Sequence, residues 1–223
     1  MSITVHHHAL LFAYLAREAC LRFAAEGEAA VLEGVRRYGE GRGRRTAETA
    51  CSHGYENDLV GLMLFGELDF AATGNVSHIE QETPYAVMVA SRCGWRNAWQ
   101  AEGVLEYGRL YCREIDAAVM RGFDPAFRFA VGGTMSDGEA VCRFLYYDGR
   151  LGPDEHERLR RGRELLGGAN LRPFAFHAGE LLSVMAGVMQ ERFDEAGYEA
   201  VEAAMRAFAV RFGDEAAAAV RAC

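Results

Sequence analysis

The spacing of apolar residues changes twice along the chain, and this change restricts the folds that the chain can adopt. Residues 8–52 and 153–223 carry apolar side chains three and four positions apart, which is the spacing of amphipathic helices. Between them, over residues 85–93, Tyr85, Val87, Val89, Ser91 and Cys93 alternate with Ala86, Met88 and Ala90, which is the period of a strand. The pattern therefore predicts an α+β fold, with helices at both ends and an antiparallel sheet between them.

The middle region, residues 56–150, is expected to hold the sheet and one packed helix. Two strand-like segments, 127–133 and 139–147, flank an Asp-Gly turn, and this arrangement is typical of a β-hairpin. The helix is expected from about Glu102 to Arg121. We therefore predict a single domain over residues 1–223, in which N- and C-terminal helical hairpins flank a central antiparallel sheet with its hairpin and packed helix.

The two helical ends resemble each other at a fixed offset of 170 positions. Shared periodicity in alanine-rich helices would produce such a match by itself. The alternative is a pair of similar helical hairpins packed against the central unit, one breaking at Gly27 and the other near Gly197. The aligned positions are His7 with His177, Arg22-Phe23 with Arg192-Phe193, Gly27 with Gly197, Ala30-Val31 with Ala200-Val201, Arg36 with Arg206 and Gly43 with Gly213.

Composition excludes several classes of protein. A formal net charge of −8 at pH 7 would repel phosphates over most of the surface, so no nucleic-acid partner is expected. No uncharged apolar stretch reaches the length of a spanning helix, and the N-terminus MSITVHHHALL lacks the features of a signal peptide, so we expect a cytoplasmic protein without membrane contact. All 24 basic residues are arginine, which excludes lysine as Schiff base or general base and favours arginine as the ligand of a substrate carboxylate.

The six cysteines form no CxxC pair, so a zinc ribbon and a thioredoxin-type motif are not expected. In a cytoplasmic protein they are expected to be free thiols, most of them packed as small apolar side chains. Cys93, Cys112, Cys142 and His78 could converge on a metal ion, but no familiar metal-ligand spacing is present, and we predict no metal and no other cofactor.

The predicted helix 102–121 places a carboxylate beside its buried face. Gly108, Cys112 and Asp116 form a ridge at spacings of four, next to the apolar stripe that includes Tyr111. A carboxylate at this border would have a raised pKa unless a cation compensates it. Asp116 is therefore either a pocket acid or base, or the partner of an arginine at the helix edge.

Two further segments hold chemically useful side chains. Cys93 ends the predicted strand between Arg92 and Arg96, which would lower its thiol pKa, and Trp95 and Trp99 could wall a small-molecule site. The alternative is a packed thiol with both indoles in the core.

Residues 76–82 place three polar side chains, those of His78, Glu80 and Glu82, on one face of a strand. This face is either a solvent-exposed edge or a polar pocket, in which a histidine and a carboxylate could move protons near neutral pH.

Several segments, in this order, are similar to those of one known family. They cover roughly residues 8–148 and resemble the L-2-amino-thiazoline-4-carboxylic acid hydrolase family. Its pattern usually has asparagine at the position of Asp124 and proline at that of Gly94. The segments are RRYGEGRGRRTAETA (36–50), NDLVGLMLFGEL (57–68), SRCGWRNAW (91–99), YGRLYCREIDAAVMRGFDP (107–125) and EAVCRFLYY (139–147).

The resemblance implies a hydrolase that opens a small ring bearing a carboxylate, by cleavage of a non-peptide C–N or C–S bond. Such a reaction needs an activated water or thiolate, an acid for the ring nitrogen and a cation for the carboxylate. We assign Cys93 as candidate nucleophile, and Asp116 as acid or base with Cys112 beside it, while His78 is an alternative base. The candidate substrate-binding residues are Tyr111, Cys142, Arg92, Trp95, Arg96 and Glu80.

A binding protein without turnover is the alternative function. A cysteine-lined pocket would equally suit a sensor-like domain for a small molecule, a metal or a tetrapyrrole, because a fold does not fix a function. The amphipathic residues 177–223 could in addition form the face of a homodimer. The expected partner in either case is a small molecule.

Overall fold

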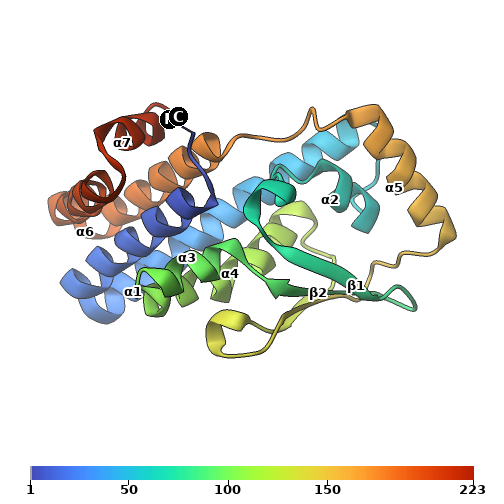
Figure 1. Cartoon of the computed structure of the whole chain (residues 1–223), viewed down its shortest axis with the longest axis horizontal. Helices are drawn as coiled ribbons and strands as arrows, with labels where there is room; N and C mark the ends of the chain where they lie inside the picture. The colour runs from blue at the N-terminus through green and yellow to red at the C-terminus, as the bar shows by residue number, and fades with distance from the viewer. Residues whose placement is uncertain (1) are drawn as a thin grey trace.

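The computed structural model describes residues 2–223 and has the predicted α+β architecture, with helices around one small sheet (Figure 1). Helices α6 and α7 lie at one end of the molecule and the sheet lies with α2 and α5 at the other, while α1 and α4 run between the two ends. No helix among these residues is long and apolar enough to cross a membrane. The elements are α1 (Val5–Ser52), α2 (Leu59–Phe65), a 3-10 turn η1 (Phe70–Thr73), β1 (Val76–Gln81), β2 (Ala86–Arg92), α3 (Gly94–Ala101), α4 (Leu105–Phe123), β3 (Phe129–Gly133), a second turn η2 (Met135–Asp137), β4 (Cys142–Tyr146), α5 (Pro153–Leu166), α6 (Phe174–Phe212) and α7 (Asp214–Arg221).

The sheet has four antiparallel strands in the order β1-β2-β4-β3. β3 and β4 form the predicted hairpin, and Thr134 caps the turn η2 by accepting the backbone N–H of Asp137. β4 begins at Cys142, and its register places Cys142 beside Ala90 of β2. The sheet thus brings the end of β2 next to the start of β4.

The buried apolar residues form two clusters. The first lies among α1, α3, α4, α6 and α7 and includes Phe12, Trp99 and Phe208. The second lies between the sheet, α2, α5 and the C-terminal parts of α1 and α4, and includes Phe65 and Phe123. Both α1 and α4 contribute side chains to both clusters, so these two helices join them.

Helices α1 and α4 pack at very short range because glycines lie where they cross. A Cβ atom at Gly43 would lie 2.1 Å from the carbonyl oxygen of Val119, and one at Gly122 would lie 2.1 Å from that of Glu40. The glycine-rich sequence 39–43 is therefore a helix surface that admits another backbone.

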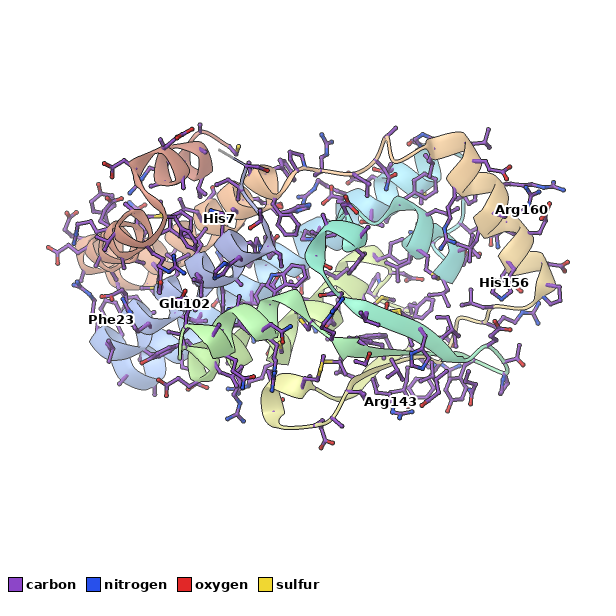
Figure 2. The ribbon with its side chains drawn as sticks, in the orientation of Figure 1. His7, Phe23, Glu102, Arg143, His156 and Arg160 are labelled. Carbon is purple, nitrogen blue, oxygen red and sulfur yellow. The ribbon has the colours of Figure 1, made fainter. Side chains whose placement is uncertain are left out.

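The offset of 170 residues seen in the sequence is also present in the structure. Each long helix contains one non-helical residue, Ala24 in α1 and Asp194 in α6, and both have a φ of 49°. Phe23 and Phe193 stack on each other at these two kinks, with ring centroids 3.8 Å apart, at the end of the molecule where Figure 2 labels Phe23. The two ends are thus similar kinked helices that pack against each other.

The helix break expected at Gly27 and near Gly197 lies three residues earlier in each copy. Both glycines are helical and serve a packing role instead. A Cβ atom at Gly27 would lie 2.1 Å from the carbonyl oxygen of Ala19, and one at Gly197 would lie 2.1 Å from that of Met189. The kink folds each helix back on itself, and only glycine fits the resulting contact.

Replacement of Gly43 by alanine should destabilise the protein by roughly 2 kcal/mol or more, because the added methyl group meets a rigid backbone. Gly41→Ala is the matched control on the same helix, since its Cβ would have no neighbour closer than 3.7 Å. That control should leave stability unchanged or raise it by about 0.5–1 kcal/mol through helix propensity. Urea unfolding of the three proteins measures both effects, and equal stability of Gly43→Ala and Gly41→Ala would contradict the short α1–α4 contact.

Candidate functional site

Asp116 lies on α4 where the helix passes from the first apolar cluster to the second, between Ile115 and Met120. Its side chain keeps part of its surface accessible. Burial raises the pKa of Asp116 to about 6, and the charge of Arg42 opposes this shift only in part. Within residues 2–223 no side chain forms a hydrogen bond or an ion pair with this carboxylate, so the predicted alternative of an arginine partner at the helix edge is not seen.

Three cysteines from different elements surround Asp116. Cys112 precedes it by one helical turn, Cys93 lies between β2 and α3, and Cys142 begins β4. Each thiol is close enough to Asp116 for the carboxylate charge to raise the pKa of the thiol further. The structure therefore brings together four of the residues that were singled out in the sequence, and we call them the thiol–Asp116 cluster.

The expected low pKa of Cys93 is wrong. Burial raises the pKa of this thiol, and the backbone N–H groups of Trp95 and Arg96 oppose the rise only in part. Arg92 does not contribute, because its exposed side chain donates to the carbonyl of Gly74 at 2.8 Å. Burial raises the pKa of Cys112 and Cys142 in the same way, so all three thiols are protonated at neutral pH.

His78 and Glu80 lie outside the cluster. They are on β1, an edge strand, and both side chains are exposed. Glu80 pairs with Arg143 of β4, and Glu82 beyond it lies 2.9 Å from His156 of α5. Figure 2 labels Arg143 and His156 on the side of the sheet and α5. The polar strand face is thus a solvent-exposed edge, with an ion pair at Glu80 and a histidine contact at Glu82.

Tyr111 and Trp95 belong to a buried network beside the cluster. The indole N–H of Trp95 donates to His8 Nδ1 at 3.0 Å, and His8 Nε2 lies 3.2 Å from the hydroxyl of Tyr38. An indole can only donate, so Nδ1 is the acceptor and Nε2 holds the proton. Burial lowers the pKa of His8 well below its usual range, so this ring stays neutral, and Tyr111 packs against its edge.

Arg42 is a residue of this region that the sequence patterns did not identify. It lies on α1, one turn after Tyr38, and only 9% of its surface is exposed. Its guanidinium lies over the Tyr38 ring, 5.6 Å from the centroid, and its charge acts on Asp116, Tyr111 and His8. The spacing of four from Tyr38 was the available signal, but an arginine in a predicted helix is ordinarily expected on its exposed face.

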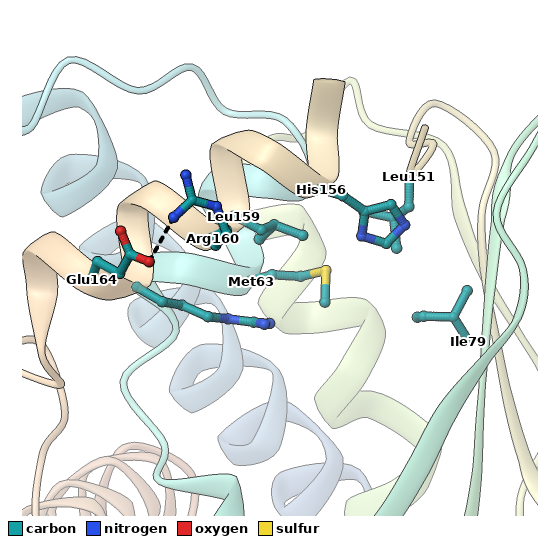
Figure 3. Close-up of a pocket in the computed structure, with 8 residues that line it drawn as sticks. Met63, Ile79, Leu151, His156, Leu159, Arg160 and Glu164 are labelled. Atoms are coloured by element: carbon teal, nitrogen blue, oxygen red, sulfur yellow. Dashed lines mark hydrogen bonds and ion pairs between the residues drawn. The ribbon is translucent and has the colours of Figure 1, made fainter. Parts of the chain in front are cut away.

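A separate cavity of about 430 Å³ lies between α5 and the sheet (Figure 3). Met63, Ile79 and Leu159 form apolar parts of its wall, and His156 and Arg160 also line it. It contains none of the residues of the thiol–Asp116 cluster. No group of three or more histidine, cysteine, aspartate or glutamate side chains in the described part of the chain is arranged to hold a metal ion.

Alkylation rates should separate the cysteines into two groups. Iodoacetamide at about pH 7.5 should modify the exposed Cys51 and Cys223 well before the three cluster thiols, because the thiolate is the reacting form. Peptide mass spectrometry over time gives the rates, and the same reaction in denaturant should remove the difference. If Cys93 reacted as fast as Cys51 in the folded protein, it would be a thiolate and the pKa argument would fail.

Asp116→Asn should stabilise the protein at high pH and not at low pH. The pKa of Asp116 is raised from 3.8 to about 6 on folding, so the folded state binds the extra proton and wild-type stability falls as pH rises between these values. Asparagine does not ionise, so the variant avoids this loss of stability. Its free energy of unfolding should exceed that of the wild type by on the order of 2 kcal/mol above pH 6 and by little below pH 4. Urea unfolding at both pH values measures the difference, and Glu106→Gln, an exposed change on the same helix, is the control.

Comparison with known proteins bears on what the cluster does. The family model described as L-2-amino-thiazoline-4-carboxylic acid hydrolase matches residues 4–146, which include Arg42, the whole sheet and the thiol–Asp116 cluster. No curated protein and no solved structure gives a significant match to the chain. Because the matched segment is well over half of the 223 residues, the protein belongs to the L-2-amino-thiazoline-4-carboxylic acid hydrolase family.

Proposed function

We propose that the protein is a hydrolase that opens a small heterocycle bearing a carboxylate, with Asp116 as the general base. The observation that supports this most directly is a carboxylate with a pKa of about 6, unpaired within the described residues and placed among three thiols in a chain of this family. A base with a pKa near the working pH removes protons efficiently, since it is ionised and still basic.

The family name specifies the chemistry of a matching substrate. In 2-amino-thiazoline-4-carboxylate, ring carbon 2 is bonded to sulfur and to two nitrogens. Water attacks this carbon and gives one proton to Asp116, while the ring nitrogen takes a proton from solvent. The bond from carbon 2 to sulfur then breaks, the proton on Asp116 goes to the leaving sulfur, and loss of the hydroxyl proton to solvent leaves a carbamoyl group on nitrogen. One water is consumed and the product is an N-carbamoyl amino acid with a free thiol.

The protonation states in the cluster favour water over a cysteine as the first nucleophile. At neutral pH Asp116 is the ionised group, and Cys93, Cys112 and Cys142 hold their protons. Cys93 is the nucleophile of the competing covalent route, in which Asp116 first takes the proton of the thiol. In the water route the three thiols instead surround the ring with small, weakly polar groups.

Hydrolysis of L-2-amino-2-thiazoline-4-carboxylate should release a thiol, and its rate should fall as pH drops below about 6, because the base is then protonated. Asp116→Asn should lower kcat by about a hundredfold or more, whereas Glu106→Gln, on the exposed face of α4, should retain the wild-type rate. Thiol release over an enzyme blank and mass spectrometry of the product provide the measurement.

The variants Cys93→Ala and Cys93→Ser separate the two routes. Both should keep kcat within about tenfold of wild type if water attacks directly, since the thiol then only lines the site. Complete loss in both, with folding intact, would favour the covalent route. Full activity of Asp116→Asn would contradict the proposed base, and the absence of any turnover would contradict the proposed substrate.

A further inference from the structure

Arg42 is a buried cation without a counter-ion in contact. Only 9% of its surface is exposed, and its Nε atom is enclosed by protein atoms yet has no hydrogen-bond partner among the described residues. Its guanidinium makes no ion pair with any side chain of residues 2–223, and its one recorded contact is the face of Tyr38. Burying an arginine in this state is costly, so its presence here calls for an explanation.

The neighbouring carboxylates are already bound by another arginine. Arg45 donates to both oxygens of Glu67, at 2.8 and 2.9 Å, and also to Glu180 at 2.7 Å. Both carboxylates act on Arg42 only through longer-range electrostatics. Residues 2–223 therefore supply two carboxylates to Arg45 and none in contact with Arg42.

A second buried polar atom nearby also lacks a partner. His177 is completely buried; its Nε2 atom lies 3.4 Å from the carbonyl oxygen of Glu67, and its Nδ1 atom has no partner in the described part of the chain. The charge of Arg42 acts on His177, so the two residues are neighbours. This part of the interior thus has two unmet hydrogen-bonding groups, one of them charged.

The internal repeat shows that the architecture does not require an arginine at this position. With the offset of 170 residues, Tyr38 corresponds to Phe208 and Arg42 to Phe212. His7, the equivalent of His177, packs on Phe212 with ring centroids 4.3 Å apart, as His177 lies near Arg42. The C-terminal half of the repeat therefore has an aromatic ring at this position, and the N-terminal half has a cation there.

From these observations we infer that Arg42 is the receptor for the carboxylate of a small, amino-acid-derived ligand in the site of Asp116. The inference rests on the proposed function for the position of the ligand, since Arg42 is the cation that acts on Asp116. A guanidinium binds a carboxylate through two parallel hydrogen bonds, which would satisfy its unused donors. Of the arginines expected for this role, Arg92 is exposed and bound to Gly74. The Nε atom of Arg96 also lacks a partner among the described residues, but its side chain is only half-buried, and Arg42 is the cation whose charge acts on Asp116.

The binding test uses a ring that cannot be hydrolysed. L-thiazolidine-4-carboxylate lacks the amidine carbon, and thiazolidine lacks the carboxylate as well. Calorimetry should show binding of the first and at least tenfold weaker binding of the second by the wild-type protein, because a hydrogen bond to a charged group is worth about tenfold or more in affinity. Arg42→Met should lose this preference, and Arg42→Lys, which keeps the charge but not the fork, should retain part of it.

Folding of the variants is checked by thermal melting. Arg42→Met should melt at or above the wild-type temperature, because it removes an uncompensated buried charge. Arg44→Lys, an exposed change on the same helix, should bind both probes as the wild type does. If Arg42→Met failed to fold, a reduced carboxylate preference in Arg42→Lys would carry the test, and an unchanged preference there would overturn the inference.

Failure of this inference differs from failure of the proposed function. Equal binding of both probes by the wild-type protein, or an unchanged preference in Arg42→Met, would overturn the role of Arg42 even if the ring were hydrolysed. Carboxylate-selective binding that depends on Arg42 would support it even if no thiazoline were turned over. The Asp116→Asn variant should still prefer the carboxylate-bearing probe but should not hydrolyse the thiazoline. This result would separate the role of Arg42 in binding from that of Asp116 as the base.

Discussion

The contact between α1 and α4 determines the rest of the structure, because both apolar clusters and the candidate site depend on it. Gly39 and Gly43 of α1 meet Ala118 and Gly122 of α4 at distances that no larger side chain would permit. At this separation, the side chains beside the glycines come close to the opposite helix. Arg42 and Asp116 thereby act on each other, although no ion pair joins them.

The site has a cost in stability that the two apolar clusters offset. Asp116 and Arg42 are opposite charges that desolvation disfavours, and they are not in direct contact, so neither recovers the full Coulomb attraction of a pair. A base and a cation that neutralised each other would be of little use to a substrate. Keeping them apart leaves the carboxylate free to take a proton and the guanidinium free to bind an anion.

The grouping of Asp116 with Cys93 and Cys142 came from the family resemblance. Helical and strand periods predicted the helical ends, the hairpin and the ridge of Cys112 and Asp116, because they show which side chains face inward. They could not decide which face of β1 is buried, since alternation is the same for both, and His78 proved to be exposed. They missed Arg42 because the apolar spacing that marks the buried face of a helix does not identify a buried arginine. The predicted low pKa of the Cys93 thiol was wrong because burial, a tertiary property, outweighed the local charges.

The kinked repeat offers a physical reason for the position of the site. Two similar helices that pack against each other through Phe23 and Phe193 would create two equivalent environments, at residues 38–42 and 208–212. Only the first environment lies on α1, beside α4 and the sheet, where Asp116 and the thiols are within reach. The second faces His7 and is filled by Phe212. The buried charge of Arg42 therefore stands in the half of the repeat where a ligand could compensate it, and the other half has a phenylalanine at the same position.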